Sequence, residues 1–289
     1  MSNAAGKRVD TTYLSLDTAE ERGFIHRDYI AHCLRWSHFI KYISQSKRYE
    51  TATIVDIGCG RELPLAKTMY SSRFIPAKFH AVDVGPINAD AISAFHSGKF
   101  PIEFHPKTDF IRWAMGRENS ADFITCFECL EHVEPKHMLA ILDAIRIVLK
   151  PGGVAFISTP CWDVVSCAAN HVNEMRYEAL GAVFEENGFV IQEVFGTFAS
   201  IREYEPHLAP GHREAFNDLR GYYDVNLLAC IFAPFYPQYS RNCLWQVTPI
   251  KDDTEWHEPR KFESLITAPT PWGSSELWRE MDRHAAGHL

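Results

Sequence analysis

The feature that most restricts the fold is a regular alternation of two patterns between residues 51 and 198. Short apolar runs, typical of buried strands, alternate with amphipathic runs of helical period. Strands that alternate with helices form parallel β-α-β units, so we expect a doubly wound sheet with a ligand site at the carboxyl ends of its strands. The predicted strands lie at 52–58, 78–84, 100–106, 121–128, 152–159 and 189–198, and the predicted helices at 63–74, 88–98, 108–117, 135–150 and 175–188.

The segments before and after this core are predicted to be additions to it. Apolar and aromatic residues recur at helical spacing before residue 50, so residues 1–50 are expected to form a helical cap packed on the sheet. Residues 51–250 form the predicted main domain. It includes an irregular insertion at about 199–222, a buried helix at 224–235 and a last strand at 242–250. Residues 251–289, with three prolines and several charges, are predicted to be a C-terminal extension.

Composition limits the class of protein and its partners. With 46% hydrophobic residues among 289, the chain can bury a large core. No window reaches the roughly 18 to 20 uninterrupted apolar residues of a membrane span, and the first residues lack a signal peptide's apolar core, so a cytoplasmic location is expected. The formal net charge of −8 disfavours extended nucleic-acid binding and favours a small-molecule partner. The sequence does not indicate an oligomeric state.

The cysteines suggest free thiols rather than a scaffold or a metal site. Eight cysteines are scattered through apolar segments, which in a reducing compartment indicates buried thiols. The segment CFEC (126–129) has the C-x-x-C spacing, and Cys161, Cys167 and His171 lie within about ten residues of one another. A zinc site would draw on a second pair at compatible spacing, and Cys126 falls inside a predicted strand, so no metal is predicted.

The segment IVDIGCG (54–60) marks where a ligand approaches the backbone. It ends a predicted strand with two glycines just before a predicted helix, and such a turn lets main-chain N–H groups approach a nucleotide-like ligand. Asp83 ends the next predicted strand, 27 residues after Asp56. A carboxylate there can accept hydrogen bonds from both hydroxyls of a ribose, although a helix cap or a surface charge is the alternative.

Five segments, in this order and spacing, resemble the class I S-adenosylmethionine-dependent methyltransferases. They are IVDIGCG, AVDV (81–84), DFITCFECLEHVEP (122–135), LKPGGVAFISTP (149–160) and NHVNEMRYEALGAVFEENGFVI (170–191). The chain is especially similar to the branch with an LEHV segment after the fourth strand. The resemblance covers about residues 50 to 200 and implies a Rossmann-like, seven-stranded mixed sheet whose last strand is antiparallel. The three-glycine pattern of dehydrogenases is not met, because position 63 is Leu.

The resemblance implies which residues hold the cofactor. The amino-acid end would lie beside Asp56 and the glycine turn, the ribose on Asp83 and the adenine against Val84. The full implied set is Asp56, Gly58, Cys59, Gly60, Asp83, Val84, Asp109, Phe110, Phe127 and Glu128. For Asp109 a helix cap is the equal alternative. A third glycine is common in the family where this chain has Glu62, which is expected to cap the following helix or to alter the cofactor's pose.

Methyl transfer from a sulfonium needs chiefly an in-line nucleophile and the exclusion of water. If the acceptor is a hydroxyl group, a base is also required, and histidine suits neutral pH. The resemblance places His132 and His171 on the substrate side, with Glu174 near them; structural or surface roles are the alternatives. Periodicity predicts that the aromatic residues of the N-terminal stretch are mainly core. Because family members often use N-terminal helices as a lid, contact of Tyr13, Tyr29 or Trp36 with an acceptor is the alternative.

The resemblance leaves three functions open. The first is methyl transfer to oxygen, nitrogen or carbon of a small molecule, which suits the acidic charge and a pocket covered by the insertion. The second is a nucleic-acid or protein methyltransferase, although the motifs of the amino-methylating and cytosine-5 DNA enzymes are absent. The third is a binding scaffold of the same fold without catalysis, for which Glu62 is the main support.

Overall fold

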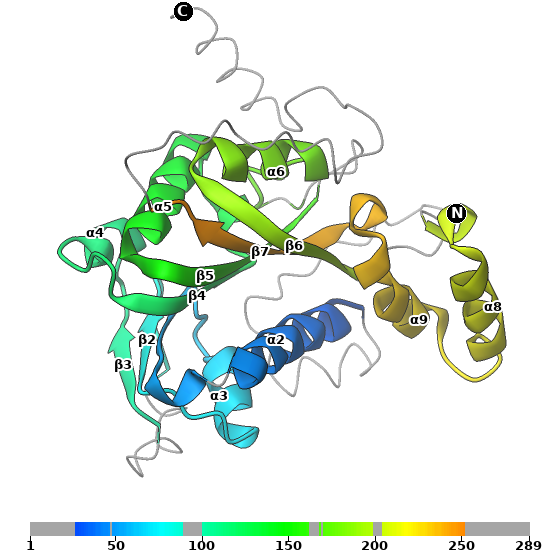
Figure 1. The fold of residues 1–289 in the computed structure, drawn as a ribbon, viewed down its shortest axis with the longest axis horizontal. Coiled ribbons are helices and arrows are strands. Elements are labelled where there is room, and N and C mark those ends of the chain that lie inside the picture. The colour runs from blue at the N-terminus through cyan, green and yellow to red at the C-terminus, as the bar shows by residue number, and fades with distance from the viewer. Residues whose placement is uncertain are drawn as a thin grey trace, which may run out of the picture.

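The computed structural model describes residues 27–46, 48–88, 100–161, 168, 170–198 and 204–251. Seven strands form one sheet in the order β3-β2-β1-β4-β5-β7-β6 (Figure 1). The first five of these run parallel, and β7 is antiparallel to both of its neighbours, which confirms the predicted mixed sheet. The strands are β1 Thr53–Ile57, β2 Lys78–Val82, β3 Ile102–His105, β4 Ala121–Phe127, β5 Leu149–Pro160, β6 Phe189–Phe198 and β7 Asn242–Pro249.

The central strands are buried on both faces and therefore read as apolar runs rather than as alternating patterns. Strand β1, for example, has four consecutive buried residues. The chain order reverses between β1 and β4, which places the switch point of the sheet there.

Helices cover both faces of the sheet (Figure 1). Prolines occupy the first position of α3 and of α5, where a missing N–H leaves no hydrogen bond unmade. The helices are α2 Arg27–Ser46, α3 Pro64–Ser71, α4 Phe110–Ala114, α5 Pro135–Val148, α6 Tyr177–Glu186, α8 Pro210–Leu219 and α9 Val225–Phe232. The expected helix at 88–98 lies almost entirely outside the described residues, and so does the tail after Lys251.

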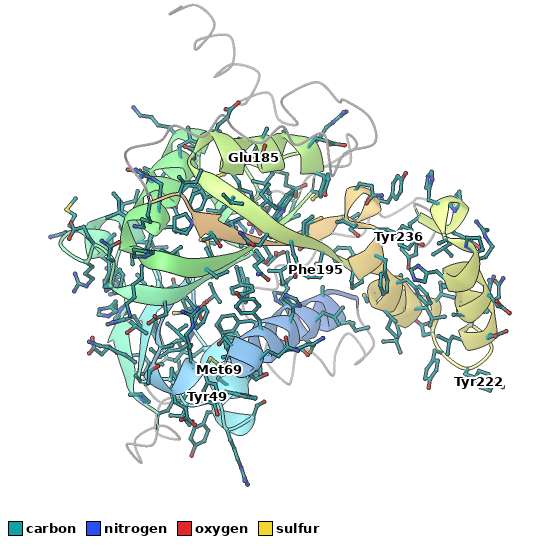
Figure 2. The ribbon with its side chains drawn as sticks, in the orientation of Figure 1. Tyr49, Met69, Glu185, Phe195, Tyr222 and Tyr236 are labelled. Atoms are coloured by element: carbon teal, nitrogen blue, oxygen red, sulfur yellow. The ribbon has the colours of Figure 1, made fainter. Side chains whose placement is uncertain are left out.

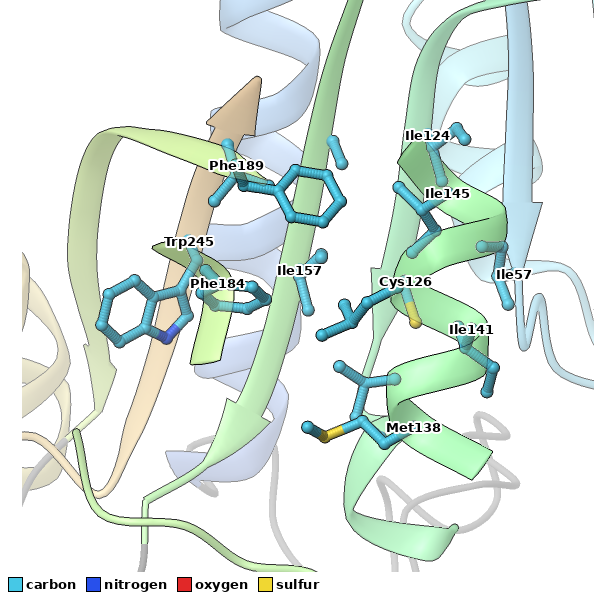
Figure 3. Packing of buried hydrophobic residues seen from close by; sticks show 14 of the residues in the cluster. Ile57, Ile124, Cys126, Met138, Ile141, Ile145, Ile157, Phe184, Phe189 and Trp245 are labelled. Carbon is cyan, nitrogen blue, oxygen red and sulfur yellow. The ribbon is translucent and has the colours of Figure 1, made fainter. Parts of the chain in front are cut away.

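Two apolar layers hold the fold together. On one face α4, α5 and α6 pack on the sheet. The fully buried Trp245 of β7 lies 5.1 Å from Tyr177 and 5.4 Å from Phe184, measured between ring centroids. Figure 3 shows Trp245 and Phe184 in this layer. On the other face α2 and α3 pack, and the ring of Phe39 lies 5.1 Å from that of Phe156. The sequence prediction that an N-terminal helix packs on the sheet is therefore confirmed for α2.

The segment after β6 differs from its prediction. Residues 199–222 were expected to be irregular, yet α8 occupies 210–219. This helix is largely polar, and its buried residue, Phe216, packs against Phe232 of α9. Figure 2 shows Tyr222 at the far tip of this unit and Tyr236 near the sheet, in agreement with exposed fractions of 84% and 7%.

The expected helix at 108–117 is confined to α4, because the chain turns at Gly116, which has a φ of 72°. Within the described part of the chain, no helix combines the length and the apolar character that a bilayer crossing requires.

Candidate active site

Loops from four parallel strands meet at one edge of the sheet. The glycine turn follows β1, Asp83 follows β2, the segment Glu128–His132 follows β4, and residues 170–174 follow β5. Parallel strands bring their carboxyl ends to the same edge, and the switch point between β1 and β4 lies within this group. The structure thus brings most of the sequence-predicted site residues to one place.

The glycine turn needs glycine at both of its positions. Gly58 has a φ of 64° and Gly60 a φ of 71°, values that side chains rarely adopt. The Gly58 N–H donates to the carbonyl oxygen of Val82 at 2.9 Å, and a Cβ on Gly58 would lie 3.2 Å from Cys129 Sγ. The turn is therefore held between the ends of β2 and β4. Among the described residues, a Cβ on Gly60 would meet only Pro64, at 3.9 Å, so this part of the structure leaves room for a ligand on that side of the turn.

Asp83 braces the glycine turn. Its Oδ2 accepts a hydrogen bond from the Gly60 N–H at 2.9 Å, and its Oδ1 accepts one from the Gly85 N–H at 2.6 Å. A carboxylate offers about four acceptor positions, so two remain for the hydroxyls of a ribose. Val84, the next residue, is 73% exposed, which leaves an apolar surface beside Asp83 that fits a purine ring.

Asp56 is buried beneath the turn. It is 4% exposed, and the Thr125 hydroxyl donates to its Oδ1 at 2.6 Å. Burial raises the pKa of Asp56 to about 7, which the Thr125 hydrogen bond opposes and the charge of Asp83 reinforces. The neighbouring Cys59 thiol is also buried, and burial raises its pKa. Asp56 can therefore respond to a nearby positive charge by losing its proton.

Glu62 does not cap the helix that follows it. The residue at the helix cap is Leu63, and no side chain caps α3. The Glu62 carboxylate instead accepts hydrogen bonds from Asn88 Nδ2 at 3.1 Å and from Lys67 Nζ at 3.4 Å. The hydrogen bond from Asn88 is the main cause of a lowered Glu62 pKa. The expectation of a cap was wrong, because these sideways partners hold the carboxylate away from the helix start.

Asp109 and Phe110 begin α4. Asp109 Oδ1 accepts a hydrogen bond from the Arg112 N–H at 3.1 Å, and Asp109 Oδ2 lies 3.2 Å from His137 Nε2. The capping role that the sequence offered as the alternative is therefore present. Phe110 is 4% exposed and stacks on Trp113. Contact of either residue with an adenine stays a prediction.

Glu128 lies just after β4 in a constrained position. Its φ is 53°, an unusual value for a glutamate, and the preceding Phe127 packs on the face covered by α2. The Glu128 carboxylate accepts hydrogen bonds from Ser158 Oγ at 2.8 Å and from Asn242 Nδ2 at 2.7 Å. Arg35 Nη1 lies 3.5 Å from Glu128 Oε1. This network ties α2, β5 and β7 to the end of β4.

Arg35 was missed by the reasoning from sequence. Its side chain is 1% exposed, and its Nη1 also donates to Asn242 Oδ1 at 3.2 Å. The available signal was its position, because Arg35 lies four residues after Ala31 and four before Phe39, both buried on the same helix stripe. A charge in line with an apolar stripe indicates a buried partner.

The two predicted catalytic histidines lie together. The ring centroids of His132 and His171 are 4.8 Å apart. His171 Nδ1 is 2.5 Å from Oε1 of Glu174, whose side chain is 1% exposed. His132 Nδ1 lies 3.1 Å from the carbonyl oxygen of Asn170 and therefore donates to it. In both histidines Nδ1 is therefore engaged, and Nε2 is the other ring nitrogen. The buried carboxylate of Glu174 orients the His171 ring.

The corner formed by the loops after β4 and β5, where both histidines lie, also holds a group able to bind a cation. Glu131 is 1% exposed, and burial together with the nearby Glu128 raises its pKa. Donor atoms of Glu131, His132 and His171 lie within 4.8 Å of one another, and oxygen and imidazole donors suit many divalent ions. The sequence analysis predicted no metal and did not recognise this group. The signal was the adjacent Glu-His pair after β4, with a histidine again after β5.

The described cysteines are free thiols, and none belongs to an ion-binding group of the described residues. The Cys161 thiol donates a hydrogen bond to the Cys243 sulfur, with 3.6 Å between the two sulfur atoms. Cys167 and Tyr13 lie outside the described residues. Trp36 of α2 packs against the apolar core between α2 and the sheet and stacks with His32.

The residues at this edge fit S-adenosylmethionine. The bare glycine turn leaves space for the amino-acid end, Asp83 keeps acceptor positions for the ribose, and Val84 exposes an apolar surface for the adenine. Asp56 has a buried carboxyl group whose charged form a cationic ligand end would stabilise. The fit therefore rests on the acceptor oxygens of Asp83 and on the space beside Gly60.

Comparison with known proteins agrees with this fit. Residues 26–194 match the family model described as a methyltransferase domain. The ubiquinone biosynthesis O-methyltransferase of Xanthomonas campestris pv. campestris is 31% identical over 121 residues, which cover 42% of this chain and 48% of that protein. The chain thus matches about half the length of this curated relative.

Two solved structures share the fold. The PH0226 protein of Pyrococcus horikoshii has a TM-score of 0.50 and 14% identity, and the match covers 84% of this chain and 97% of that one. The methyltransferase solved with the Trm112 activator of Haloferax volcanii has a TM-score of 0.50 and 13% identity, covering 81% and 93%. The chain therefore belongs to the family of methyltransferase domains, whose methyl donor is S-adenosylmethionine.

Proposed function

We propose that this protein transfers the methyl group of S-adenosylmethionine to a hydroxyl oxygen of a small molecule. The observation that carries the proposal is the pair of imidazoles in the loops after β4 and β5, one of them held by the buried Glu174. Oxygen acceptors, unlike amines, need a base, and this corner supplies one. The name O-methyltransferase of the Xanthomonas relative supports the same acceptor class.

The chain's own residues would work mainly by positioning. The cofactor supplies an electrophilic methyl group when bound. Asp83 and the glycine turn would fix its ribose and amino-acid end, and Phe127 would border the methyl-bearing end. His171 would accept the hydroxyl proton at Nε2, while Glu174 stabilises the resulting imidazolium through Nδ1. His132, whose ring lies against His171, would share the acceptor's hydroxyl.

A second mechanism at the same corner uses a divalent cation in place of the free imidazole. It is favoured by the approach of Glu131, His132 and His171 donor atoms to within 4.8 Å. A bound cation lowers the pKa of a coordinated hydroxyl group. Treatment with EDTA separates the mechanisms, because a base made only of imidazole keeps its rate, whereas an ion-dependent enzyme loses activity that Mg²⁺, Mn²⁺ or Zn²⁺ then restores.

The finer assignments are also proposals. We assign the chain to the branch with an LEHV segment, because LEHV (130–133) follows β4 and its histidine, His132, hydrogen-bonds the Asn170 carbonyl oxygen in the loop after β5. The free thiols support a reducing, cytoplasmic location. We also propose that residues 51–250 form the main domain and that α2 is part of an N-terminal cap.

Turnover with radiolabelled S-adenosylmethionine tests the proposed function. The purified chain is incubated with panels of phenols and catechols, of amines, and of oligonucleotides at two salt concentrations. We expect methyl transfer to hydroxyl compounds. Transfer to oligonucleotides, weakened by salt, would favour the nucleic-acid alternative. Cofactor binding without turnover in any panel would favour a scaffold.

Replacing Asp83 by alanine is expected to weaken binding of S-adenosylhomocysteine by about 1 to 3 kcal/mol, because charge-assisted hydrogen bonds to the ribose are lost. The bracing of Gly60 and Gly85 is lost as well. Isothermal titration calorimetry measures the change. Asp143→Ala is the matched control, since that carboxylate is exposed and pairs with Arg146 on α5. Equal affinities for wild type and Asp83→Ala would reject the ribose assignment.

Cofactor affinity is expected to rise about tenfold between pH 5.5 and 7. In the free protein the raised pKa of Asp56, about 7, keeps much of the carboxyl group protonated below that pH. A cationic ligand end favours the carboxylate, so binding releases a proton, and affinity increases as the pH approaches the free-state pKa. Calorimetry in buffers of different ionisation enthalpy detects the proton. In Asp56→Asn the pH dependence is expected to vanish; its persistence would assign it to another group.

A further inference from the structure

A second group of potential metal ligands lies at the outer edge of the sheet, away from the imidazole pair. His80 is on β2, and Glu103 and His105 are on β3. In the parallel register His80 pairs with Glu103 and Val82 pairs with His105. Residues two apart on a strand share a face, so all three side chains project from the same side of the sheet.

The donor atoms are spaced as a tetrahedral ion requires. His80 Nδ1 lies 3.1 Å from His105 Nε2 and 3.3 Å from Glu103 Oε2, and the three donor atoms all fall within 4.8 Å of one another. Zinc-to-nitrogen bonds of about 2.0 to 2.1 Å place neighbouring ligands of a tetrahedron about 3.3 Å apart. An ion can therefore enter with only small side-chain shifts.

A single proton can form a good hydrogen bond with only some of these three atoms. Two ring nitrogens and one carboxylate oxygen point at a common space, and a single N–H on His80 Nδ1 can donate well to only one of the other two atoms. A divalent cation is bound by all three lone pairs at once. A donor set of two imidazoles and one carboxylate suits zinc and similar ions.

The surroundings hold the ligands in place. Lys78 Nζ bonds the other oxygen of Glu103, Oε1, at 2.8 Å, which leaves Oε2 turned toward the imidazoles. The ring of Trp113 on α4 lies 5.1 Å from that of His80 and 5.6 Å from that of His105. His80 is 7% exposed whereas the Glu103 side chain is 51% exposed, so a fourth ligand can reach the ion from solvent. The charges of Lys78 and of nearby Arg117 oppose the ion, so the affinity is expected to be below that of a thiolate site.

We propose that His80, Glu103 and His105 form a binding site for Zn²⁺ or a similar divalent ion, with water as the fourth ligand. The ion would join β2 to the edge strand β3. It would also steady the end of β2, because the His105 carbonyl oxygen accepts a hydrogen bond from the Asp83 N–H at 3.2 Å. The proposal goes beyond the proposed methyl transfer and does not depend on it.

Titration with Co²⁺ and Zn²⁺ tests the site in the full chain carrying His171→Ala, which disables the other ion-binding group. In this background we expect one ion per chain by calorimetry, visible absorption bands with Co²⁺, and a higher melting temperature with Zn²⁺. His105→Gln and Glu103→Gln are each expected to abolish all three signals. Glu103 is largely exposed, so its variant retains the fold even if His105→Gln does not.

His137→Gln is the matched control, because that exposed histidine pairs with Asp109 and lies outside the group. Its ion binding should equal that of the background protein. Quenching of Trp113 fluorescence by Co²⁺ gives a local readout that Trp113→Phe removes. If Glu103→Gln and His105→Gln bind the ion with unchanged stoichiometry and affinity, or if the background protein binds none, the proposal is wrong.

Discussion

Replacement of His171 by alanine is expected to lower kcat for a hydroxyl acceptor by about 10² to 10⁴-fold, the range for loss of a positioned general base. The Nδ1 of this ring is already engaged by the buried Glu174, so Nε2 is the nitrogen that we propose accepts the proton. The binding constant of S-adenosylhomocysteine is expected to stay unchanged, because the histidine lies beyond β5 and not in the glycine turn.

The matched variants separate a base from a structural role. Glu174→Gln keeps the side-chain shape and is expected to lower kcat by a smaller factor, since a neutral amide stabilises an imidazolium less than a carboxylate does. His137→Ala, an exposed histidine at the start of α5, should leave kcat unaltered. Full activity in His171→Ala would remove this residue from the mechanism and move the proton to His132 or to a bound ion.

Replacement of Arg35 by alanine is expected to reduce the free energy of unfolding by about 3 kcal/mol, near the lower end of the range for breaking a buried ion pair. The lower end applies because the Glu128 side chain is 20% exposed and keeps its Ser158 and Asn242 partners. The guanidinium also bonds His32 Nδ1 at 2.7 Å, and burial is the main cause of the lowered pKa of that histidine. Loss of Arg35 thus loosens α2 from the site.

Thermal unfolding measures this effect as a decrease of about 6 to 12 °C for a domain of this size. Lys41→Ala on the exposed face of the same helix is the control and should shift the midpoint by no more than a degree or two. If Arg35→Ala melts with the control, the network of Arg35, Glu128 and Asn242 does not contribute to stability, and α2 is held by apolar contacts such as Phe39 alone.

Periodicity predicted the parallel, doubly wound core of the sheet, whereas the antiparallel last strand was implied only by the family resemblance. The strands around Asp56, Asp83 and Cys126 are apolar runs bounded by turn residues, so their pattern survives without an alignment. Helix α8 was not predicted, because it packs through a few separated residues, such as Phe216 on Phe232 and His212 on Tyr236, rather than through a repeated apolar stripe. Tertiary packing of that kind leaves little trace in local sequence.

The candidate site was predicted in part. The glycine turn and Asp83 could be found because backbone conformation and strand ends impose residue types. The partners of Glu62 and Arg35 could not, since Asn88 lies 26 residues from the first and Asn242 lies 207 residues from the second. Contacts over such separations are set by the topology of the sheet. The approach of Glu131, His132 and His171 likewise depends on the pairing of β4 with β5.

The most direct measurement for the central claim is a crystal structure of the chain with S-adenosylhomocysteine. The account predicts the ribose hydroxyls within hydrogen-bonding distance of Asp83, the amino-acid end over Gly58 and Gly60, and the sulfur facing the corner of His132 and His171. A ligand bound elsewhere on the molecule, or none at saturating concentration, would contradict it.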